Sequence, residues 1–119
     1  MDFELNKERP ICPQICEKLC VSITCGEYKA GDRLPSVREL ALLFGINPNT
    51  VQRCYEQLEN RGIINSQRGS GNFVSEDISQ AKAAVDALKK QKTADYLLEM
   101  LNLGYEYSEI KKIIEEWKE

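Results

Sequence analysis

The sequence contains no histidine among its 119 residues. Without an imidazole there is no Cys–His nucleophile pair, and zinc sites that combine Cys with His are excluded. The sequence shows no phosphate-binding loop and no pair of carboxylates that would mark a catalytic cleft. We therefore expect a protein that is not an enzyme and uses no cofactor. A site built from cysteines alone is the one metal site that this composition leaves open.

Long apolar runs are also missing, and none approaches the roughly 20 residues that span a bilayer. The first five residues, Met1-Asp2-Phe3-Glu4-Leu5, lack the basic start and apolar core of a secretory signal. The cysteine count is five, an odd number, which argues against a disulfide framework of the kind found in exported proteins. We expect a cytoplasmic protein with no membrane partner.

The cysteines nevertheless form a pattern. Cys12, Cys16 and Cys20 recur every four residues, which places them along one face of a helix, and Cys25 follows. They could pack as small apolar groups, or they could sense redox state or metal. A reactive thiolate needs cations nearby to lower its pKa, and only Lys18 is close in sequence. Packing is the favoured interpretation, and the sensor remains an alternative.

Charge is unevenly distributed along the chain, whose net charge is -3. Residues 1–27 carry a net charge of -2, residues 28–74 carry +2, and residues 75–119 carry -3. The middle of the chain is therefore its basic part. An excess of two positive charges indicates nucleic-acid binding only if the basic side chains share a face.

Two capped helices follow one another closely in this basic part. The first has Ser36 as N-cap with Glu39 three residues later, which is the capping-box pattern, and Gly45 ends it. The second has Asn47 as N-cap and Pro48 at its first helical position. Its apolar face includes Cys54, which we expect in the core. Two helices joined by so short a turn form a helix-turn-helix.

The segments around this motif complete the expected fold. Short apolar runs flank the glycine-rich residues 68–71, which predicts a β-hairpin, the wing. Residues 10–24 and the chain from Ile78 onward show helical periodicity. We expect a mainly α protein with a small β wing: a winged helix-turn-helix over residues 1–75 and a helical dimerisation tail over residues 76–119. The residues expected to form the dimer are Val85, Leu88, Leu97, Leu98, Leu101, Ile110, Ile113, Ile114 and Trp117.

The second helix of such a motif can lie in the major groove of DNA with its first residues at base edges. Asn and Gln pair bidentately with adenine and Arg with guanine, whereas the free N–H groups at the helix start attract phosphate. Small residues at a wing tip allow close approach to a phosphate or a minor groove. The residues expected to contact DNA are Ser36, Arg38, Asn47, Asn49, Thr50, Gln52, Arg53, Arg68, Gly69, Ser70 and Gly71.

These segments resemble the DNA-binding signature of the GntR family. Residues 31–41 read Gly-Asp-Arg-Leu-Pro-Ser-Val-Arg-Glu-Leu-Ala, and residues 47–59 read Asn-Pro-Asn-Thr-Val-Gln-Arg-Cys-Tyr-Glu-Gln-Leu-Glu. Gly-Ile-Ile at 62–64 and Gly-Ser-Gly-Asn-Phe-Val at 69–74 continue the match. The start of the second helix and the short helical tail resemble the YtrA subfamily in particular.

The resemblance implies a homodimer that binds an inverted-repeat operator in promoter DNA, usually as a repressor, and often in an operon with an ABC transporter. Carried over by position, the DNA contacts are Arg38, Asn49, Thr50, Gln52 and the wing tip at 69–71. Many relatives outside this subfamily have Arg at the position of Gln52, whereas here Arg53 follows it. Which of the two reads a base stays open.

Three alternatives accompany this hypothesis. A winged helix can serve as a docking module for another protein, in which case DNA binding would be neither salt-dependent nor sequence-preferring. The regulator could respond to thiol oxidation or metal through the cysteines. A small effector could occupy a pocket between two subunits, lined by Trp117 and tyrosines.

Overall fold

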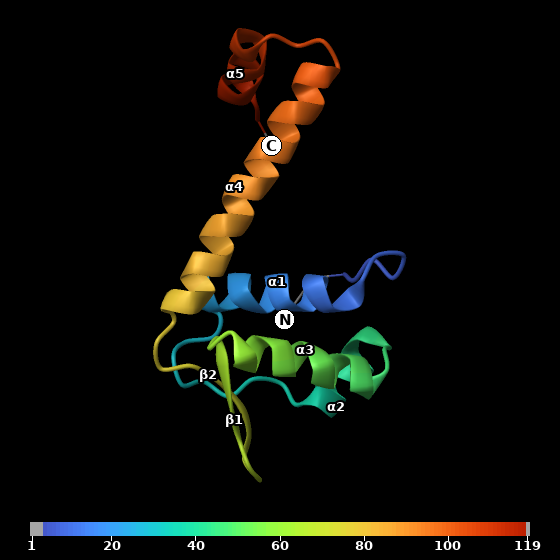
Figure 1. Cartoon of the computed structure of the whole chain (residues 1–119), viewed down its shortest axis with the longest axis vertical. Helices are drawn as coiled ribbons and strands as arrows, with labels where there is room; N and C mark the ends of the chain where they lie inside the picture. The colour runs from blue at the N-terminus through green and yellow to red at the C-terminus, as the bar shows by residue number, and fades with distance from the viewer. Residues whose placement is uncertain (1–3, 119) are drawn as a thin grey trace. The chain divides into compact units, whose positions relative to one another are not determined.

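The computed structural model describes residues 4–118, so residues 1–3, part of the stretch that we expected to lack a signal, lie outside it. The expected architecture, mainly helical with a two-stranded wing, is confirmed (Figure 1). By its contacts the chain divides into two compact units, the first ending at Val85 and the second starting at Asp86. The elements are α1 (Ile11–Thr24), α2 (Val37–Phe44), α3 (Pro48–Asn60), β1 (Ile64–Gln67), β2 (Gly71–Val74), α4 (Ser79–Asn102) and α5 (Tyr107–Glu116).

The core of the first unit forms where α1 and α2 pack against α3. The apolar stripes found in the sequence supply it, because residues four apart on a helix share a face. Tyr55 of α3 is buried as well, and its hydroxyl donates a hydrogen bond of 2.6 Å to the carbonyl oxygen of Pro35. The side chains without solvent exposure in these helices are Ile15, Leu19, Leu40, Val51, Cys54 and Leu58.

The helix ends lie where the sequence predicts them. The Ser36 hydroxyl accepts a hydrogen bond of 3.0 Å from the Glu39 N–H, and the side-chain oxygen of Asn47 accepts one of 2.8 Å from the Asn49 N–H. Gly45 ends α2 in the left-handed conformation at φ 63°, which favours glycine because it has no Cβ. These caps fix the short connection that orients α3 relative to α2.

The wing is joined to the segment that leads into α2. Its strands pair antiparallel from Ile64 opposite Val74 to Gln67 opposite Gly71. The Leu34 N–H donates to the Asn72 carbonyl at 2.9 Å, and the Val74 N–H donates to the Asp32 carbonyl at 2.8 Å. The backbone of residues 31–34 therefore holds the base of the hairpin at a fixed distance from the start of α2.

The boundary between the two compact units lies within α4. Asp77 caps α4 by accepting a hydrogen bond of 2.9 Å from the Ser79 N–H. Ala81 and Val85, in the first two turns of α4, are then buried in the core of the first unit. These turns pack with the first unit, and the second compact unit begins at Asp86. The dimerisation tail over residues 76–119 stays a prediction.

The second unit contains the remainder of α4 together with α5. Glu106 and Glu109 form a reciprocal capping box at the start of α5, with the Glu106 N–H donating 3.0 Å to the Glu109 carboxylate. Ile110 is fully buried, next to a hollow of about 350 Å³ that Leu97 and Tyr107 also line. Between residues 4 and 118, no helix is long and apolar enough to cross a membrane.

Candidate nucleic-acid interface

Helix α3 separates its apolar and polar side chains onto two faces. Val51, Cys54, Tyr55 and Leu58 point into the core. The opposite face presents polar groups near the N-terminal end of the helix. Packing of the buried face fixes the orientation of these polar groups. Of the predicted DNA contacts on this helix and its cap, Thr50 is half-buried and the exposed ones are Asn47, Asn49, Gln52 and Arg53.

Some of these polar groups already have partners in the chain. The side-chain oxygen of Asn47 is used by the cap, which leaves its NH₂ group to meet DNA. The amide nitrogen of Gln52 donates to the Glu56 carboxylate at 3.2 Å, one turn along the helix. Bidentate pairing with adenine needs both the oxygen and the nitrogen of a Gln amide, so Gln52 would have to exchange this partner for a base.

Helix α2 brings a second basic group to the same region. Arg38 lies in the first turn of α2 and is exposed. Ser36 is half-buried and its hydroxyl caps the helix, so its position is fixed by a structural role as well. Since α2 and α3 are packed together and joined by a three-residue turn, Arg38 moves as one body with α3.

The wing tip is exposed at Arg68, Gly69 and Ser70, whereas Gly71 is half-buried. Gly69 has φ 79°, and a Cβ built there would meet nothing within 4 Å. The glycine is therefore required by backbone conformation rather than by neighbouring atoms in the chain. Open space in front of this backbone is what a phosphate needs for close approach.

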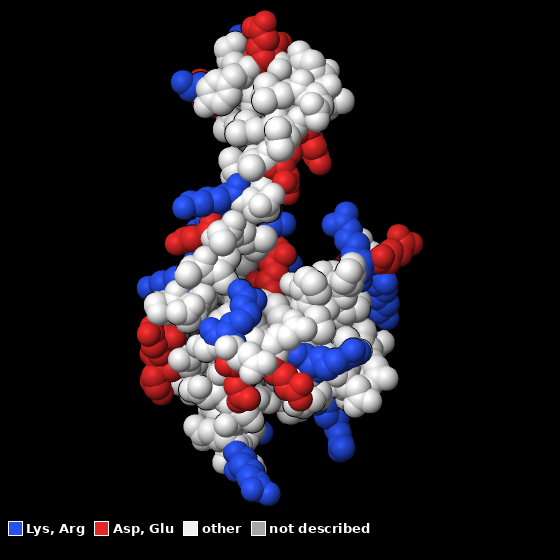
Figure 2. Space-filling view, in the orientation of Figure 1, with Lys and Arg blue, Asp and Glu red and all other residues white. Residues whose placement is uncertain are grey.

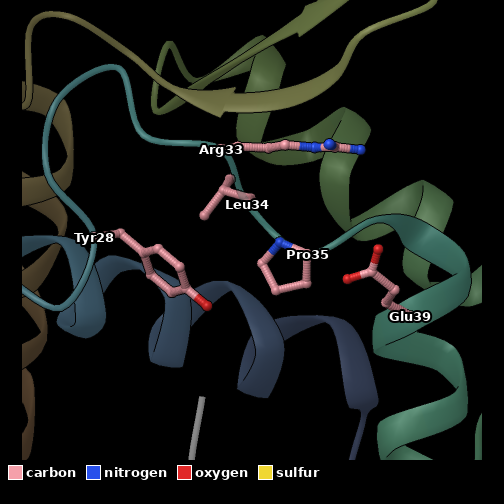
Figure 3. Close-up of a pocket in the computed structure, with 5 residues that line it drawn as sticks. All are labelled: Tyr28, Arg33, Leu34, Pro35 and Glu39. Carbon is pink, nitrogen blue, oxygen red and sulfur yellow. The ribbon is translucent and has the colours of Figure 1, made fainter.

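The structure also places a residue at this interface that we did not predict. Arg33 is exposed, and its Nε lies 3.4 Å from where a Cβ on Gly71 would be. Figure 3 shows its extended side chain beside the wing strand, with Pro35 and Glu39 nearby around a hollow of about 280 Å³. In the sequence, the one indication of a role for Arg33 was its position in the basic middle of the chain. Its place beside the wing comes from the β-bridge between Arg33 and Phe73.

The basic side chains do not merge into one continuous patch on the face shown in Figure 2. They project singly from the first unit, including from the end of the wing, with acidic side chains between them. On this face, the positive excess of residues 28–74 is therefore divided among separate side chains.

The cysteines occupy different environments. All five are free thiols: Cys25 is exposed, Cys12 half-buried, and Cys16, Cys20 and Cys54 buried. Burial raises the pKa of the Cys16 thiol to about 11, and burial also raises that of Cys20. Within the described part of the chain, no group of three or more Cys, Asp and Glu side chains is arranged to hold a metal ion.

The residues predicted for dimerisation fall into three groups by exposure. Val85 and Ile110 are already buried by the chain itself, so their surface is not available to a partner. Leu88 and Leu97 are half-buried. The remaining five are exposed, at 60% for Leu98, 45% for Leu101, 37% for Ile113, 57% for Ile114 and 67% for Trp117.

Comparison with known sequences identifies relatives along the whole chain. Residues 13–74 match the family described as "Bacterial regulatory proteins, gntR family". The HTH-type transcriptional regulator YhcF of Bacillus subtilis is 33% identical over 119 residues, which cover 100% of this chain and 98% of that protein. The HTH-type transcriptional repressor YtrA of the same organism is 42% identical over 77 residues, 65% of this chain and 59% of that protein.

Solved structures agree with the fold. A GntR family transcriptional regulator from Listeria monocytogenes has a TM-score of 0.85 and 35% identity, over 96% of this chain and 100% of that chain. The DNA-binding domain of AraR in complex with operator ORE1 has a TM-score of 0.53 and 25% identity, over 63% of this chain and 94% of that chain.

Proposed function

The chain belongs to the GntR family of bacterial regulatory proteins, and from this we propose that it is a repressor that binds an inverted-repeat DNA operator as a homodimer. As a family member it is a DNA-binding transcriptional regulator and not an enzyme. The observation that carries the proposal is the two-faced helix α3, whose apolar side is buried while its first turns present amide and guanidinium groups to solvent.

In the proposed complex, the N-terminal end of α3 enters the major groove. Asn49 and either Gln52 or Arg53 then face base edges, and the N–H groups at the helix start face a phosphate. Arg38 on α2 and Arg68 on the wing reach the DNA on either side of α3. Arg33 joins them, because its guanidinium lies beside the wing strand that carries Gly71.

Pairing of two copies is proposed from the second unit. Leu98, Ile114 and Trp117 are more than half exposed, and among residues 86–118 Ile110 alone is fully buried. Exposing large apolar side chains together is costly, because each one contributes about 1.5–3 kcal/mol when removed from water. A second copy of the same unit is present in every solution of this protein and can cover these side chains. A two-fold dimer also matches the symmetry of an inverted repeat.

The proposal also specifies that the protein represses transcription and that it controls a transporter operon. Its support is the similarity to the repressor YtrA and the subfamily pattern in residues 47–53. A dimer seated on a promoter represses by occupying DNA that RNA polymerase needs. A small effector bound between the subunits would make this repression depend on the concentration of the effector.

The test is fluorescence anisotropy of the purified protein on its own upstream promoter DNA and on a scrambled duplex, at several salt concentrations. We expect promoter-preferring binding that weakens steeply as salt rises, because cationic side chains release counterions from phosphates. Weak binding of equal strength to both duplexes would overturn the proposal. Docking to another protein through the winged helix would then become the leading alternative.

A further inference from the structure

Two thiols from different helices meet beneath α3. Cys12, in the first turn of α1, donates a hydrogen bond of 3.6 Å from its Sγ to the carbonyl oxygen of Thr50 in α3. Cys54 lies one helical turn beyond Thr50, and because helical side chains tilt toward the N-terminus, its thiol leans toward the turn where Cys12 lies. Cys12 is half-buried, whereas Cys54 has no exposed surface. A sulfur that solvent can reach therefore lies against the turn of α3 that precedes a sulfur inside the core.

We propose that Cys12 and Cys54 are a redox pair that closes to a reversible disulfide between α1 and α3, and that closure weakens operator binding. The effect on DNA rests on the function proposed above, whereas formation of the bond does not. The oxidant is a hydroperoxide, for which hydrogen peroxide serves as the probe. Free thiols and burial in the core are not enough to identify such a pair. The packing of α1 against α3 is what identifies it.

The reaction balances in two steps. The Cys12 thiolate attacks one peroxide oxygen, the O–O bond breaks, and protonation of the departing oxygen releases water and leaves a sulfenic acid on Cys12. The Cys54 sulfur then attacks the Cys12 sulfur, the S–O bond breaks, and a second water leaves with the Cys54 proton. The two thiols together lose two electrons and two protons, and the peroxide is reduced to two waters.

The order of attack follows from burial. Burial and the neighbouring Cys12 thiol raise the pKa of Cys54, so Cys54 holds little thiolate and cannot begin the reaction. Cys12 is the member that a peroxide molecule in solvent can reach. A thiol of high pKa is also a poor leaving group, so reduction of the closed bond is slow. We therefore expect the disulfide to persist once it has formed, because its reduction is slow.

Cys16 competes for the same partner but is placed differently. Its Sγ donates to the backbone carbonyl of Cys54 at 3.8 Å, whereas the Cys12 Sγ lies at the Thr50 carbonyl, one turn earlier. The Cys54 side chain tilts toward that earlier turn and away from its own carbonyl. Burial raises the pKa of Cys16 to about 11, so it too is protonated at neutral pH. The pair that closes is therefore Cys12 with Cys54, and Cys16 stays a packing residue.

Closure changes the helix that meets DNA. A covalent bond draws the two sulfurs closer than the thiol contact does, so the N-terminal half of α3 must shift toward α1. Thr50 already contacts Cys12, and the flanking Asn49 and Gln52 move with the backbone. Loss of one good base contact from this shift corresponds to about tenfold weaker operator binding.

The experiment treats the full-length protein with hydrogen peroxide, alkylates the remaining thiols, and maps disulfide-linked peptides by mass spectrometry without reduction. Anisotropy on promoter DNA is measured before oxidation, after oxidation and after re-reduction. We expect a peptide that joins Cys12 to Cys54, a loss of two hydrogens from the intact mass, and about tenfold weaker binding that reductant restores.

Three variants make the test specific. Cys12→Ser and Cys54→Ala should each abolish the cross-link and leave DNA binding insensitive to peroxide. Cys25→Ser removes an exposed cysteine and is the matched control, which should behave like the parent protein. Cys12→Ser is the main variant, because Cys12 is half-buried and its replacement disturbs the core least.

A cross-link through Cys16, or oxidation without any cross-link, overturns the assignment of the pair. A Cys12–Cys54 cross-link with unchanged promoter binding overturns the switch. Reduced protein that fails to prefer its promoter contradicts the proposed function instead, and the peptide map still decides whether the bond forms.

Discussion

At the scale of single residues, the proposed interface contains side chains that the fold already uses and side chains that it does not. Ser36 and Asn47 cap helices, and Gln52 is hydrogen-bonded to Glu56. The side chain of Arg38, by contrast, is exposed and takes no part in the helix cap. A guanidinium exposed on a rigid helix without a structural task is the group whose removal should affect binding alone.

Arg38→Ala should weaken promoter binding by about 1–3 kcal/mol per half-site if the arginine pairs with guanine. The fold should be unaffected, because the side chain is exposed. Anisotropy titrations measure the affinity, and thermal unfolding monitors stability. Arg61→Ala, at the far end of α3, is the matched control, and equal effects of the two substitutions would remove Arg38 from the interface.

Gln52→Ala and Arg53→Ala should differ in kind. Loss of a base-reading residue should reduce the preference for promoter over scrambled DNA, whereas loss of a phosphate contact should reduce the salt slope by about 1 per site. We expect the first behaviour for Gln52 and the second for Arg53. Reversed behaviour in titrations at several salt concentrations would assign base reading to Arg53.

At the scale of elements, local chemistry determines where the helices begin and end. The helix-turn-helix could be predicted closely because Ser36, Gly45, Asn47 and Pro48 act through their nearest neighbours in the chain. The place of Arg33 could not, since it depends on pairing between the segment before α2 and a wing strand that follows α3. The position of Cys12 against α3, one turn from Cys54, was missed for the same reason, because it depends on how two helices pack.

Ser36→Ala should lower the free energy of unfolding by about 0.5–2 kcal/mol, because the Glu39 N–H loses its hydrogen-bond acceptor. Urea unfolding followed by circular dichroism measures the change. Ser70→Ala at the exposed wing tip is the control and should stay close to the parent protein in stability. A loss for Ser36→Ala no larger than for this control would mean that the cap contributes little.

At the scale of the whole molecule, the helices of the tail could be predicted from periodicity, but their allocation between units could not. The apolar stripe runs through Val85 and Leu88 without a break, so nothing local separates residues that pack on the first unit from those beyond it. Only the arrangement of the chain decides that Val85 is internal and that Leu98 and Trp117 are exposed.

Replacing both Leu98 and Trp117 by Glu should convert dimer to monomer, since carboxylates inside an apolar interface would lose their hydration. Light scattering after size-exclusion chromatography measures the mass. The control is Leu42→Glu, which changes a leucine of α2 that is 78% exposed and should leave the dimer intact. A variant that remains dimeric would place the interface outside the second unit.

The second unit has one further consequence, because Ile110 is the one fully buried side chain among its described residues, 86–118. So small an interior provides little stability of its own, and the proposed association of two copies would complete it. Mass action then couples the fold of the unit to the number of copies present. Dilution would loosen the tail and release the promoter in one event, which would make the abundance of the protein itself an input to the switch.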